Sequence, residues 1–484
     1  MNSSHSSKPI KVTMNNSIFK QLAIFQAYFS FAVLFLFAYL RDIRFRFASK
    51  SRHTDPRTAE GYTQLFDRKL QLYATHLFRP ISDCFARPIC SKAGATVCLL
   101  ERKSLDQYDR QFDYTGGSYE VVNMGSYNYL DLNETCGLRS DQVVEVIRSR
   151  GVGVCSTSVE LGASDINSRL DRKMAEFLAV EDALTFGMGF ATNSSVLPTL
   201  LDSRTLVLSD ENNHGSIIHG CKLSNATVKV FAHNDVKHLE RLLVEGLQSE
   251  RQFSKMIIVV EGIYSMEGSI CKLPEILALK KKYKAYLYLD EAHSIGALGG
   301  RGRGVCDHYQ VDTADVDILM GTFSKAFGAV GGYVAGKKSV IDHIRRYAFA
   351  HHYATAMAPP VAQQVLAALD HLDAPSGVKL IKQLQANTLY FRRRLLAAGF
   401  EVIGDECSPV VPLMLYHPAK IVFFNRELDK DGVAVAIVGY PATSFSGLRA
   451  RFCVSAGHSH QQLDKVIEVV VNVGKRCRAD YLRK

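Results

Sequence analysis

The sequence contains no tryptophan among its 484 residues, and it also lacks several motifs that would point to common ligands. Its eleven cysteines form no CxxC pair and no Cys/His cluster with zinc spacing, so we expect no metal site and interpret them as reduced core residues. No GxxxxGK[ST] loop occurs, which excludes the usual cradle for nucleotide phosphates. No run of five or six basic residues occurs either, so the net charge of +10 does not predict nucleic-acid binding.

One long apolar segment stands near the N-terminus, where residues 21–40 carry no charged side chain. At about 1.5 Å per residue, such a helix is just long enough for a hydrocarbon core of about 30 Å. The basic stretch RDIRFRF follows it in place of a small-residue cleavage site, which argues against a signal peptide. We predict a membrane helix over residues 17–41, with a buried or interfacial helix as the alternative, and the excess of basic residues after it places the rest of the chain in the cytosol.

The rest of the chain has the composition and pattern of a globular α/β protein, with 47% hydrophobic and 22% charged residues. Short runs that are apolar on both faces alternate with helical patterns such as 236–247 and 273–283. Buried strands that alternate with helices predict a mostly parallel, doubly wound sheet. We expect a disordered N-terminus over 1–16, a linker and small-domain segment over 42–121, a large domain over 122–358 and a C-terminal α+β domain over 359–484. The predicted strands are residues 206–208, 256–260, 286–289, 318–320 and 333–335.

Asp290 directly follows one of these predicted strands, and His293 lies three residues further on. Ligands of open α/β sheets bind beyond the carboxyl ends of the strands, and a partly buried carboxylate there needs a cationic partner. A protonated pyridine nitrogen is such a partner, although an aspartate that caps the next helix is an equally common explanation. The DEAH tetrapeptide also occurs in helicases, but the absence of a nucleotide loop removes that interpretation.

Lys325 stands in a turn after another predicted strand, with the hydroxyl residues Thr322 and Ser324 beside it. A lysine in a desolvated pocket loses proton affinity and becomes a nucleophile, and nearby hydroxyl groups can bind phosphate oxygens. The alternative is a surface lysine on a glycine-rich turn.

Two further features follow predicted strands. A helix begins near Gly189 and Phe190, and free amides at a helix N-terminus suit a phosphate, although a Gly-x-Gly turn is often only a packing device. His214 follows the strand at 206–208, where it could lie flat on an aromatic cofactor or serve a structural role.

Taken together, these motifs resemble the α-oxoamine synthases, which are pyridoxal 5'-phosphate (PLP) enzymes of fold type I that condense an amino acid with an acyl-CoA and release CO₂. The similarity extends from about Gly61 to the C-terminus, and within the family it is closest to the catalytic subunits of eukaryotic serine palmitoyltransferase. The stretches that carry it, in order, are RPICSKAGA, NMGSYNYL, GVCSTSVELG, FGMGFATNS, LSDENNHGSIIHG, VEGIYSMEG, LDEAHSIGALGGRGRGV, MGTFSKAFGAVGGYVAG, YATAMAPP and RARFCVSAGHS.

The resemblance implies a role for each site residue. Lys325 would bind PLP covalently and act as the catalytic base, Asp290 would pair with the pyridine nitrogen, and His293 would bond the phenolic oxygen. His214 would stack on the ring. The phosphate would be held by Gly189, Phe190, Thr322 and Ser324, and by Thr355 from across a subunit boundary. Asn128 and Arg451 would bind the amino-acid substrate.

The resemblance also implies L-serine and palmitoyl-CoA as substrates, a non-identical long-chain-base-1 type partner subunit, contact with membrane lipid, and an endoplasmic reticulum location. Some residues depart from the family pattern, including Gly215 in place of alanine and the Gly439-Tyr440 pair before Pro441, which leaves the carboxylate contacts less defined than the ring contacts. Another acyl-CoA and amino-acid condensation, or a noncatalytic scaffold subunit, are the alternative functions.

Overall fold

The structure is a computed structural model that describes residues 18–48, 72–105 and 112–482. The N-terminus predicted to be disordered, residues 1–16, lies outside the described residues. So do residue 17 of the predicted membrane helix and two stretches of the 42–121 segment, residues 49–71 and 106–111.

The large domain is built on a seven-stranded sheet in the order β3-β9-β8-β7-β6-β4-β5. Neighbouring strands from β8 to β5 are parallel, while β9 runs antiparallel to both β3 and β8. This confirms the predicted mostly parallel α/β fold. The strands are β3 (Asp182–Phe186), β4 (Thr205–Asp210), β5 (Thr227–Phe231), β6 (Lys255–Glu261), β7 (Tyr286–Asp290), β8 (Ile318–Thr322) and β9 (Gly332–Gly336).

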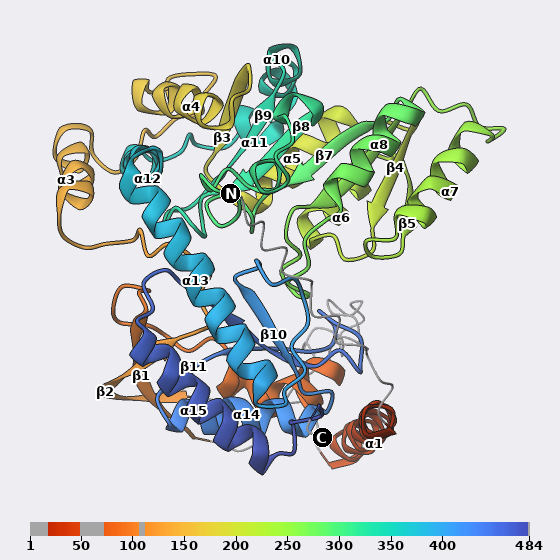
Figure 1. The fold of residues 1–484 in the computed structure, drawn as a ribbon, viewed down its shortest axis with the longest axis vertical. Coiled ribbons are helices and arrows are strands. Elements are labelled where there is room, and N and C mark those ends of the chain that lie inside the picture. Colours follow the sequence, from red (N-terminus) through yellow and green to blue (C-terminus); the bar gives the residue numbers. More distant parts are fainter. Residues whose placement is uncertain (1–17, 49–71, 106–111, 483–484) are drawn as a thin grey trace, which may run out of the picture.

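Helices cover both faces of this sheet, because its strands are apolar on both sides (Figure 1). On β4, for example, Leu206 and Leu208 belong to one apolar cluster and Val207 to the other. One face is covered by α5 (Gly189–Leu200), α6 (Gly215–Leu223) and α10 (Lys338–Tyr347). The other is covered by α4 (Asp165–Leu178), α7 (Val236–Leu247), α8 (Leu273–Tyr283) and α12 (Pro359–Asp373). Shorter or peripheral helices are α3 (Leu138–Arg150), α9 (Val305–Tyr309) and α11 (Phe349–His352).

The sheet brings the ends of five strands to one edge. Since β3, β4, β6, β7 and β8 all run in the same direction, their carboxyl ends meet there. The turns that leave this edge carry Gly189, His214, Asp290 and Lys325. The fold therefore gathers residues that are far apart in the sequence.

The small domain takes its strands from both ends of the chain. Strands β1 (Thr96–Ser104) and β2 (Phe112–Asn123) form a hairpin, and β2 also pairs with β11 (Val433–Ala434) from the C-terminal part. A second sheet has the order β10-β13-β12, with β10 (Val410–Met414), β12 (Ala436–Val438) and β13 (Arg449–Cys453). Helices α14 (Pro418–Lys430) and α15 (His460–Arg476) pack against them around an apolar core. Two short helices, the π-helix η2 (Ala74–Phe78) and the 3₁₀-helix η3 (Arg79–Cys84), precede β1.

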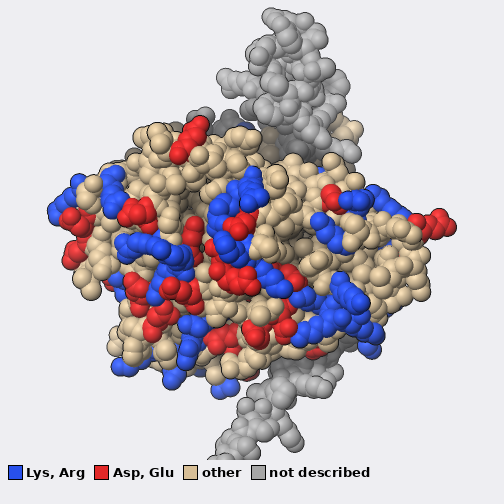
Figure 2. Space-filling view, turned by 90° about the horizontal axis from the view of Figure 1, so that it is seen from above, with Lys and Arg blue, Asp and Glu red and all other residues tan. Residues whose placement is uncertain are grey.

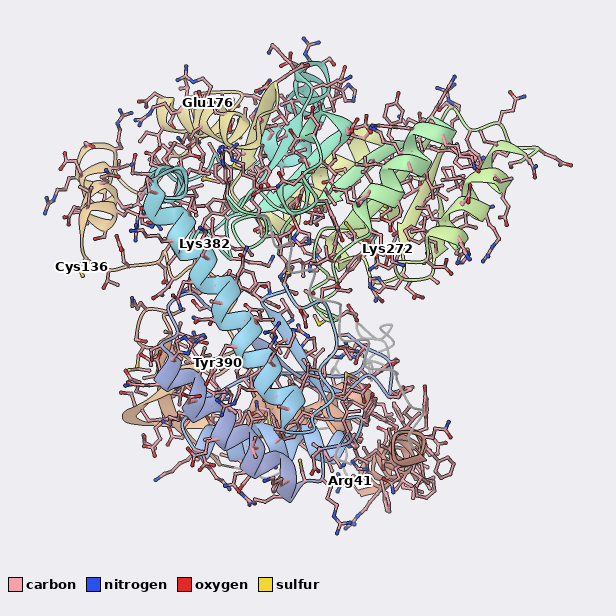
Figure 3. All side chains as sticks on the ribbon, in the orientation of Figure 1. Arg41, Cys136, Glu176, Lys272, Lys382 and Tyr390 are labelled. Carbon is pink, nitrogen blue, oxygen red and sulfur yellow. The ribbon has the colours of Figure 1, made fainter. Side chains whose placement is uncertain are left out.

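One long helix, α13 (Pro375–Ala397), links the two domains. It leaves the large domain after α12 and runs down into the small domain, with Lys382 and Tyr390 marking its course (Figures 1 and 3). Its buried residues join both cores, since Ile381 packs in the large domain and Phe391 in the small one.

Helix α1 (Ile18–Ala48) lies beside the small domain (Figure 1). Ala23, Ala27 and Ala38 are buried against the body, and Phe31 packs into the small-domain core, while Ser30 Oγ lies 2.8 Å from His417 Nε2. The opposite face exposes large apolar side chains such as Phe25. Residues 21–44 are long and apolar enough to cross a membrane by length and composition, which is weak evidence for an anchor.

Two further features of the fold are the distribution of surface charge and the exposure of the cysteines. Lysine and arginine are intermixed with acidic residues on the face seen in Figure 2. All eleven cysteines are free thiols, but the expectation that they are core residues is only partly met, because Cys90, Cys136, Cys155 and Cys407 are exposed.

Candidate active site

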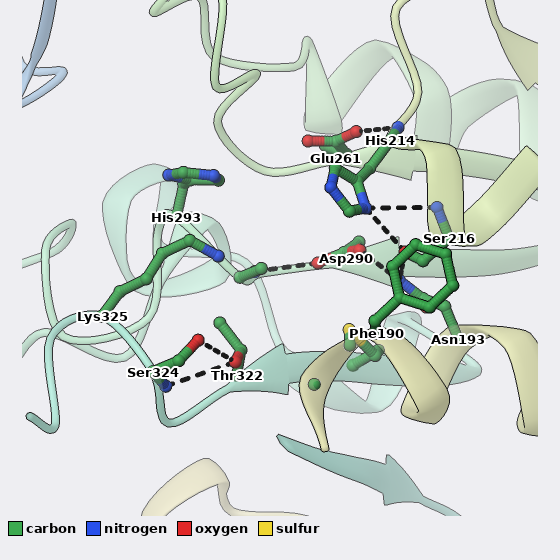
Figure 4. Close-up of a pocket in the computed structure, with 13 residues that line it drawn as sticks. Phe190, Asn193, His214, Ser216, Glu261, Asp290, His293, Thr322, Ser324 and Lys325 are labelled. Atoms are coloured by element: carbon green, nitrogen blue, oxygen red, sulfur yellow. Dashed lines mark hydrogen bonds between the residues drawn. The ribbon is translucent and has the colours of Figure 1, made fainter. Parts of the chain in front are cut away.

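A cavity of about 180 Å³ lies at the edge where the parallel strands end (Figure 4). Eight of the predicted site residues line it: Gly189, Phe190, His214, Asp290, His293, Thr322, Ser324 and Lys325. The structure therefore brings together residues from four strand ends and two helix starts. The roles assigned to them stay predictions.

Lys325 stands in the turn after β8 and points into this cavity, toward the side that holds His293 and Asp290 (Figure 4). Desolvation lowers its pKa to about 8, although the charges of Asp290 and Glu261 oppose this effect. A substantial fraction of the amine is therefore unprotonated at neutral to mildly basic pH, which makes it a nucleophile and a base.

Asp290 is the last residue of β7, and only 2% of it is exposed. Its Oδ2 accepts a hydrogen bond from Asn193 Nδ2 at 2.7 Å, and its Oδ1 accepts one from the Ala292 amide at 2.9 Å. It thus caps the following turn, as the alternative interpretation proposed, and also faces the cavity. No lysine or arginine among the described residues forms an ion pair with it, so this carboxylate can accept a cationic ligand.

His293 is buried beside Lys325. Its Nδ1 lies 2.8 Å from the hydroxyl of Tyr129, which is itself fully buried. Burial lowers the pKa of His293 well below its usual value, and the charges of Lys325 and Arg451 act in the same direction. A neutral imidazole whose Nδ1 is engaged leaves Nε2 for a ligand.

His214 is the N-cap of α6, where its Nδ1 accepts a hydrogen bond from the Ser216 amide at 3.2 Å. An accepting Nδ1 places the proton of the neutral ring on Nε2. Burial lowers the pKa of His214, while the Asp290 charge opposes this. The His214 backbone amide donates to Glu261 Oε1, so the end of β6 fixes the histidine.

The start of α5 and the turn after β8 lie close together. Helix α5 has no side-chain cap, which leaves its N-terminal dipole available for an anion. Thr322 Oγ1 lies 2.7 Å from Ser324 Oγ, and it donates to the Gly331 carbonyl at 2.8 Å. A Cβ on Gly189 would lie 2.6 Å from Thr322 Oγ1, so only glycine allows this approach. Amides and hydroxyls that converge in this way suit a phosphate.

These features fit PLP. A buried carboxylate without a cationic side-chain partner matches a protonated pyridine nitrogen, a lysine with a lowered pKa matches the aldehyde, and the α5 N-terminus with the Thr322 and Ser324 hydroxyls matches the phosphate.

Three other predicted site residues lie outside this cavity. Asn128 is buried, and its Nδ2 donates to the Ala93 carbonyl at 2.7 Å and to Asp131, while its Oδ1 has no hydrogen-bond partner. Arg451 is buried on β13, and its Nε also lacks a partner. Thr355 is exposed and forms an isolated bridge with Thr157.

A second cavity of about 1260 Å³ begins at Tyr127 and Arg451. It runs between the small domain and α1, where Phe29, Phe31 and Leu34 line it. This volume exceeds the 300–1,000 Å³ or so of typical ligand pockets, and the lining is mostly apolar.

The sequence did not single out several residues that build the site. Asn193 connects Ser216 to Asp290 by hydrogen bonds. Its Nδ2 donates to Ser216 Oγ at 2.9 Å and also to Asp290 Oδ2. Glu261 lies beside Asp290 in the β6–β7 register, and burial raises its pKa well above the usual value. Asn193 stands four residues after Gly189 on α5, one helical turn from the predicted phosphate position, and this spacing was the only local signal for it.

Comparisons with known proteins agree with this geometry. The chain matches the family model of aminotransferase class I and II over residues 119–470. It is 42% identical over 475 residues to "Serine palmitoyltransferase 2" of Caenorhabditis elegans, which covers 96% of this chain and 85% of that protein. It is also 42% identical over 468 residues to "Serine palmitoyltransferase 3" of Homo sapiens, with coverages of 94% and 85%.

Solved structures have the same fold. A structure described as SPT with PLP is 26% identical to this chain and superposes with a TM-score of 0.70, covering 76% of this chain and 90% of that one.

Proposed function

Because this chain belongs to the serine palmitoyltransferase 2 family, a branch of the aminotransferase class I and II enzymes, we propose that it is the catalytic subunit of a serine palmitoyltransferase. The reaction joins the Cα of L-serine to the acyl carbon of palmitoyl-CoA, releases CoA and CO₂, and yields 3-ketodihydrosphingosine. The observation that carries this proposal is the cavity that holds Lys325, Asp290 and His293 at the strand ends.

PLP is the cofactor, and when bound it supplies an electron sink for the carbanion at the substrate Cα. Asp290 would hold the pyridine nitrogen protonated, and His293 Nε2 would bond the phenolic oxygen. The amides of Gly189 and Phe190, with Thr322 and Ser324, would hold the phosphate.

Lys325 would move the proton in the first chemical step. With a pKa of about 8, its free amine can take the Cα proton of serine and later return a proton to the product. His214, with a proton on Nε2, would donate a hydrogen bond to the substrate above the ring.

The substrate carboxylate would bind near Arg451 and Asn128. Arg451 Nε is buried without a partner, which a carboxylate would satisfy. Asn128 has its Oδ1 unsatisfied, so in the orientation described it would accept a hydrogen bond from the serine amine or hydroxyl.

The apolar cavity between Tyr127 and α1 supports a long acyl chain as the second substrate. It starts beside the amino-acid position and ends at the helix that we propose to be in the membrane. A palmitoyl chain could therefore place its thioester carbon near Lys325 while its tail lies among apolar side chains.

We also propose that a long-chain-base-1 type subunit completes the site. Phe190 lines the PLP cavity yet is 48% exposed, and Leu161 and Tyr353 close to Thr355 in the fold are 91% and 83% exposed. Such apolar exposure beside a cofactor site suits a subunit interface, and Thr355 would lie at that subunit boundary.

The membrane location rests on α1. We propose a single-pass anchor in the endoplasmic reticulum membrane with the catalytic body in the cytosol. The apolar exposed face of α1 supports lipid contact, and Arg41 and Arg44 at its end would lie among lipid headgroups.

The test is co-expression with a long-chain-base-1 type subunit, followed by assay of the purified complex with serine, glycine or alanine and acyl-CoAs of several lengths. Serine with palmitoyl-CoA should give the fastest release of CoA and CO₂, and Lys325→Ala should abolish it. Faster product formation with glycine would indicate another acyl-CoA condensation. A complex without PLP absorbance, or one that keeps full activity with Lys325→Ala, would indicate a scaffold subunit instead.

A further inference from the structure

Tyr127 lies beside Lys325, which lines the smaller cavity. Its ring lines the large apolar cavity. Lys325 Nζ lies 5.7 Å from the ring centroid, and Arg451 Cζ lies 4.6 Å from it. The His293 ring meets Tyr127 edge-on, with centroids 5.1 Å apart and an interplanar angle of 77°. The Tyr127 ring therefore contacts three residues of the predicted reaction site: Lys325, Arg451 and His293.

The ring can stabilise both cations. A cation within about 6 Å of an aromatic centroid is attracted by the negative ring face, and the attraction grows when water is excluded. Arg451 is buried, and among the described residues it forms no ion pair with a carboxylate. Its Nη1 contacts the Met266 sulfur, a weak acceptor, at 3.6 Å, and the guanidinium also interacts with the Tyr127 hydroxyl and the Cys453 thiol. Tyr127 therefore contacts the guanidinium through its ring face and through its hydroxyl.

The phenol itself stays neutral. Burial raises the pKa of Tyr127, and the Arg451 charge offsets this only in part. The contribution to the site thus comes from the ring face and the neutral hydroxyl rather than from a phenolate.

We propose that Tyr127 is a positioning residue for the amino-acid substrate. Its ring face holds the Arg451 guanidinium and the Lys325 amine at a fixed separation, so that the carboxylate and the Cα of serine are presented together at the mouth of the acyl cavity. This inference rests on the proposed function for the identity of the substrate, but the arrangement of the ring and the two cations does not depend on it.

The test compares Tyr127→Phe, which keeps the ring face, with Tyr127→Leu, which keeps an apolar side chain but loses the face. Both variants are made in the co-expressed, PLP-loaded complex. Amino-acid binding is measured from the change in PLP absorbance on titration with serine, without acyl-CoA, and KM is measured for both substrates. Tyr127→Leu should bind serine roughly tenfold more weakly, with full PLP content and a KM for palmitoyl-CoA within about twofold of wild type. Tyr127→Phe should stay within about threefold for serine.

Tyr440→Leu is the matched control. Tyr440 lines the same cavity and stacks on Phe445, with centroids 4.4 Å apart. Its loss should raise the KM for palmitoyl-CoA and leave serine binding unchanged.

Three results would overturn the proposal: wild-type serine binding in a fully loaded Tyr127→Leu complex, an equal loss in Tyr127→Phe, or an effect on palmitoyl-CoA alone. A wild-type complex that responds to glycine but not to serine would refute the proposed substrate. The glycine titration of the same variants would then still decide the role of Tyr127.

Discussion

Lys325 illustrates how one residue combines two opposing influences. Burial lowers its pKa to about 8, while the negative charge of Asp290 limits the shift. The same amine is therefore reactive enough to bond an aldehyde and basic enough to take a proton.

This pKa predicts the pH dependence of PLP uptake. Below pH 8 the amine is mostly protonated and cannot attack the aldehyde, so the uptake rate should rise about tenfold per pH unit up to about pH 7.5. Above pH 8 the amine is mostly free and the rate should level off. Stopped-flow absorbance of apoprotein mixed with PLP measures this. A midpoint near the usual lysine value of about 10.4 would show that the burial effect is absent in solution.

The substitution Asp290→Asn should reduce the catalytic rate but leave the fold intact. The amide has the same shape and can still accept the hydrogen bond from Ala292, but it carries no charge to keep a pyridine nitrogen protonated. We expect kcat to fall by about a hundredfold or more, as when one electrostatic stabiliser is removed from an active site. Far-ultraviolet circular dichroism and PLP content should stay near wild type, and a fall of less than about threefold would contradict the assigned role.

At the scale of elements, the junction of β3, α5 and β8 depends on a close backbone approach. Gly189→Ala places a Cβ 2.6 Å from Thr322 Oγ1 and 3.2 Å from the Gly331 carbonyl. The turn proposed to bind the phosphate must then open, and we expect the PLP dissociation constant to rise about tenfold, which corresponds to about 1.4 kcal/mol. Fluorescence titration of the apoprotein measures it.

Gly187→Ala is the control for this change, because a Cβ there meets only the Met357 Cα at 3.9 Å. It should bind PLP within about twofold of wild type. Equal losses in the two variants would mean that the effect of Gly189→Ala is not specific to the phosphate turn.

Helix α1 offers a second element-scale test. Ala27 is fully buried against the small domain, whereas Ala32 on the same helix is exposed. Ala27→Leu should overpack the contact and destabilise the docked helix by about 1–3 kcal/mol, while Ala32→Leu should be neutral. Limited proteolysis in detergent reports release of the helix. Equal protease sensitivity of both variants would argue against the packing seen here.

The same scale shows what the sequence could predict. The patterns at 236–247 and 273–283 match α7 and α8 to the residue, because apolar periodicity and clear breaks bound both segments. The position of Glu261 beside Asp290 could not be predicted, because it results from strand order and register, which local sequence patterns do not encode. The hydrogen bond from Asn128 to the Ala93 carbonyl likewise links segments that the sequence pattern does not relate.

At the scale of the whole molecule, the two domains and α1 place a small polar cavity next to a large apolar one. The cavity proposed to hold PLP lies at the edge of the large sheet, and the cavity proposed to hold the acyl chain lies between the small domain and α1. The strand ends were predictable from the sequence. The second cavity was not, because its walls come from segments at opposite ends of the chain.

If the exposed face of α1 contacts lipid, then charges on that face should release the protein from membranes. Leu22, Phe25 and Leu36 are exposed there. Replacing all three with aspartate should abolish flotation with phospholipid vesicles, since each charge costs roughly 3 kcal/mol in an apolar membrane position. The control places the same charges on exposed residues far from α1: Val230, Leu247 and Tyr286. Flotation of the α1 variant at wild-type level would contradict lipid contact by this face.

The pairing of β2 with β11 has a consequence for synthesis of the chain on the ribosome. Strand β2 is made early, yet its parallel partner at Val433 follows about 300 residues later. At about 5–20 residues per second, β2 waits about 15–60 s for that partner. The seven strands of the large sheet are all made within this interval. We therefore expect the newborn chain to fold from its middle outward, with the β1–β2 hairpin unpaired on the β11 side until the last part of the protein is made.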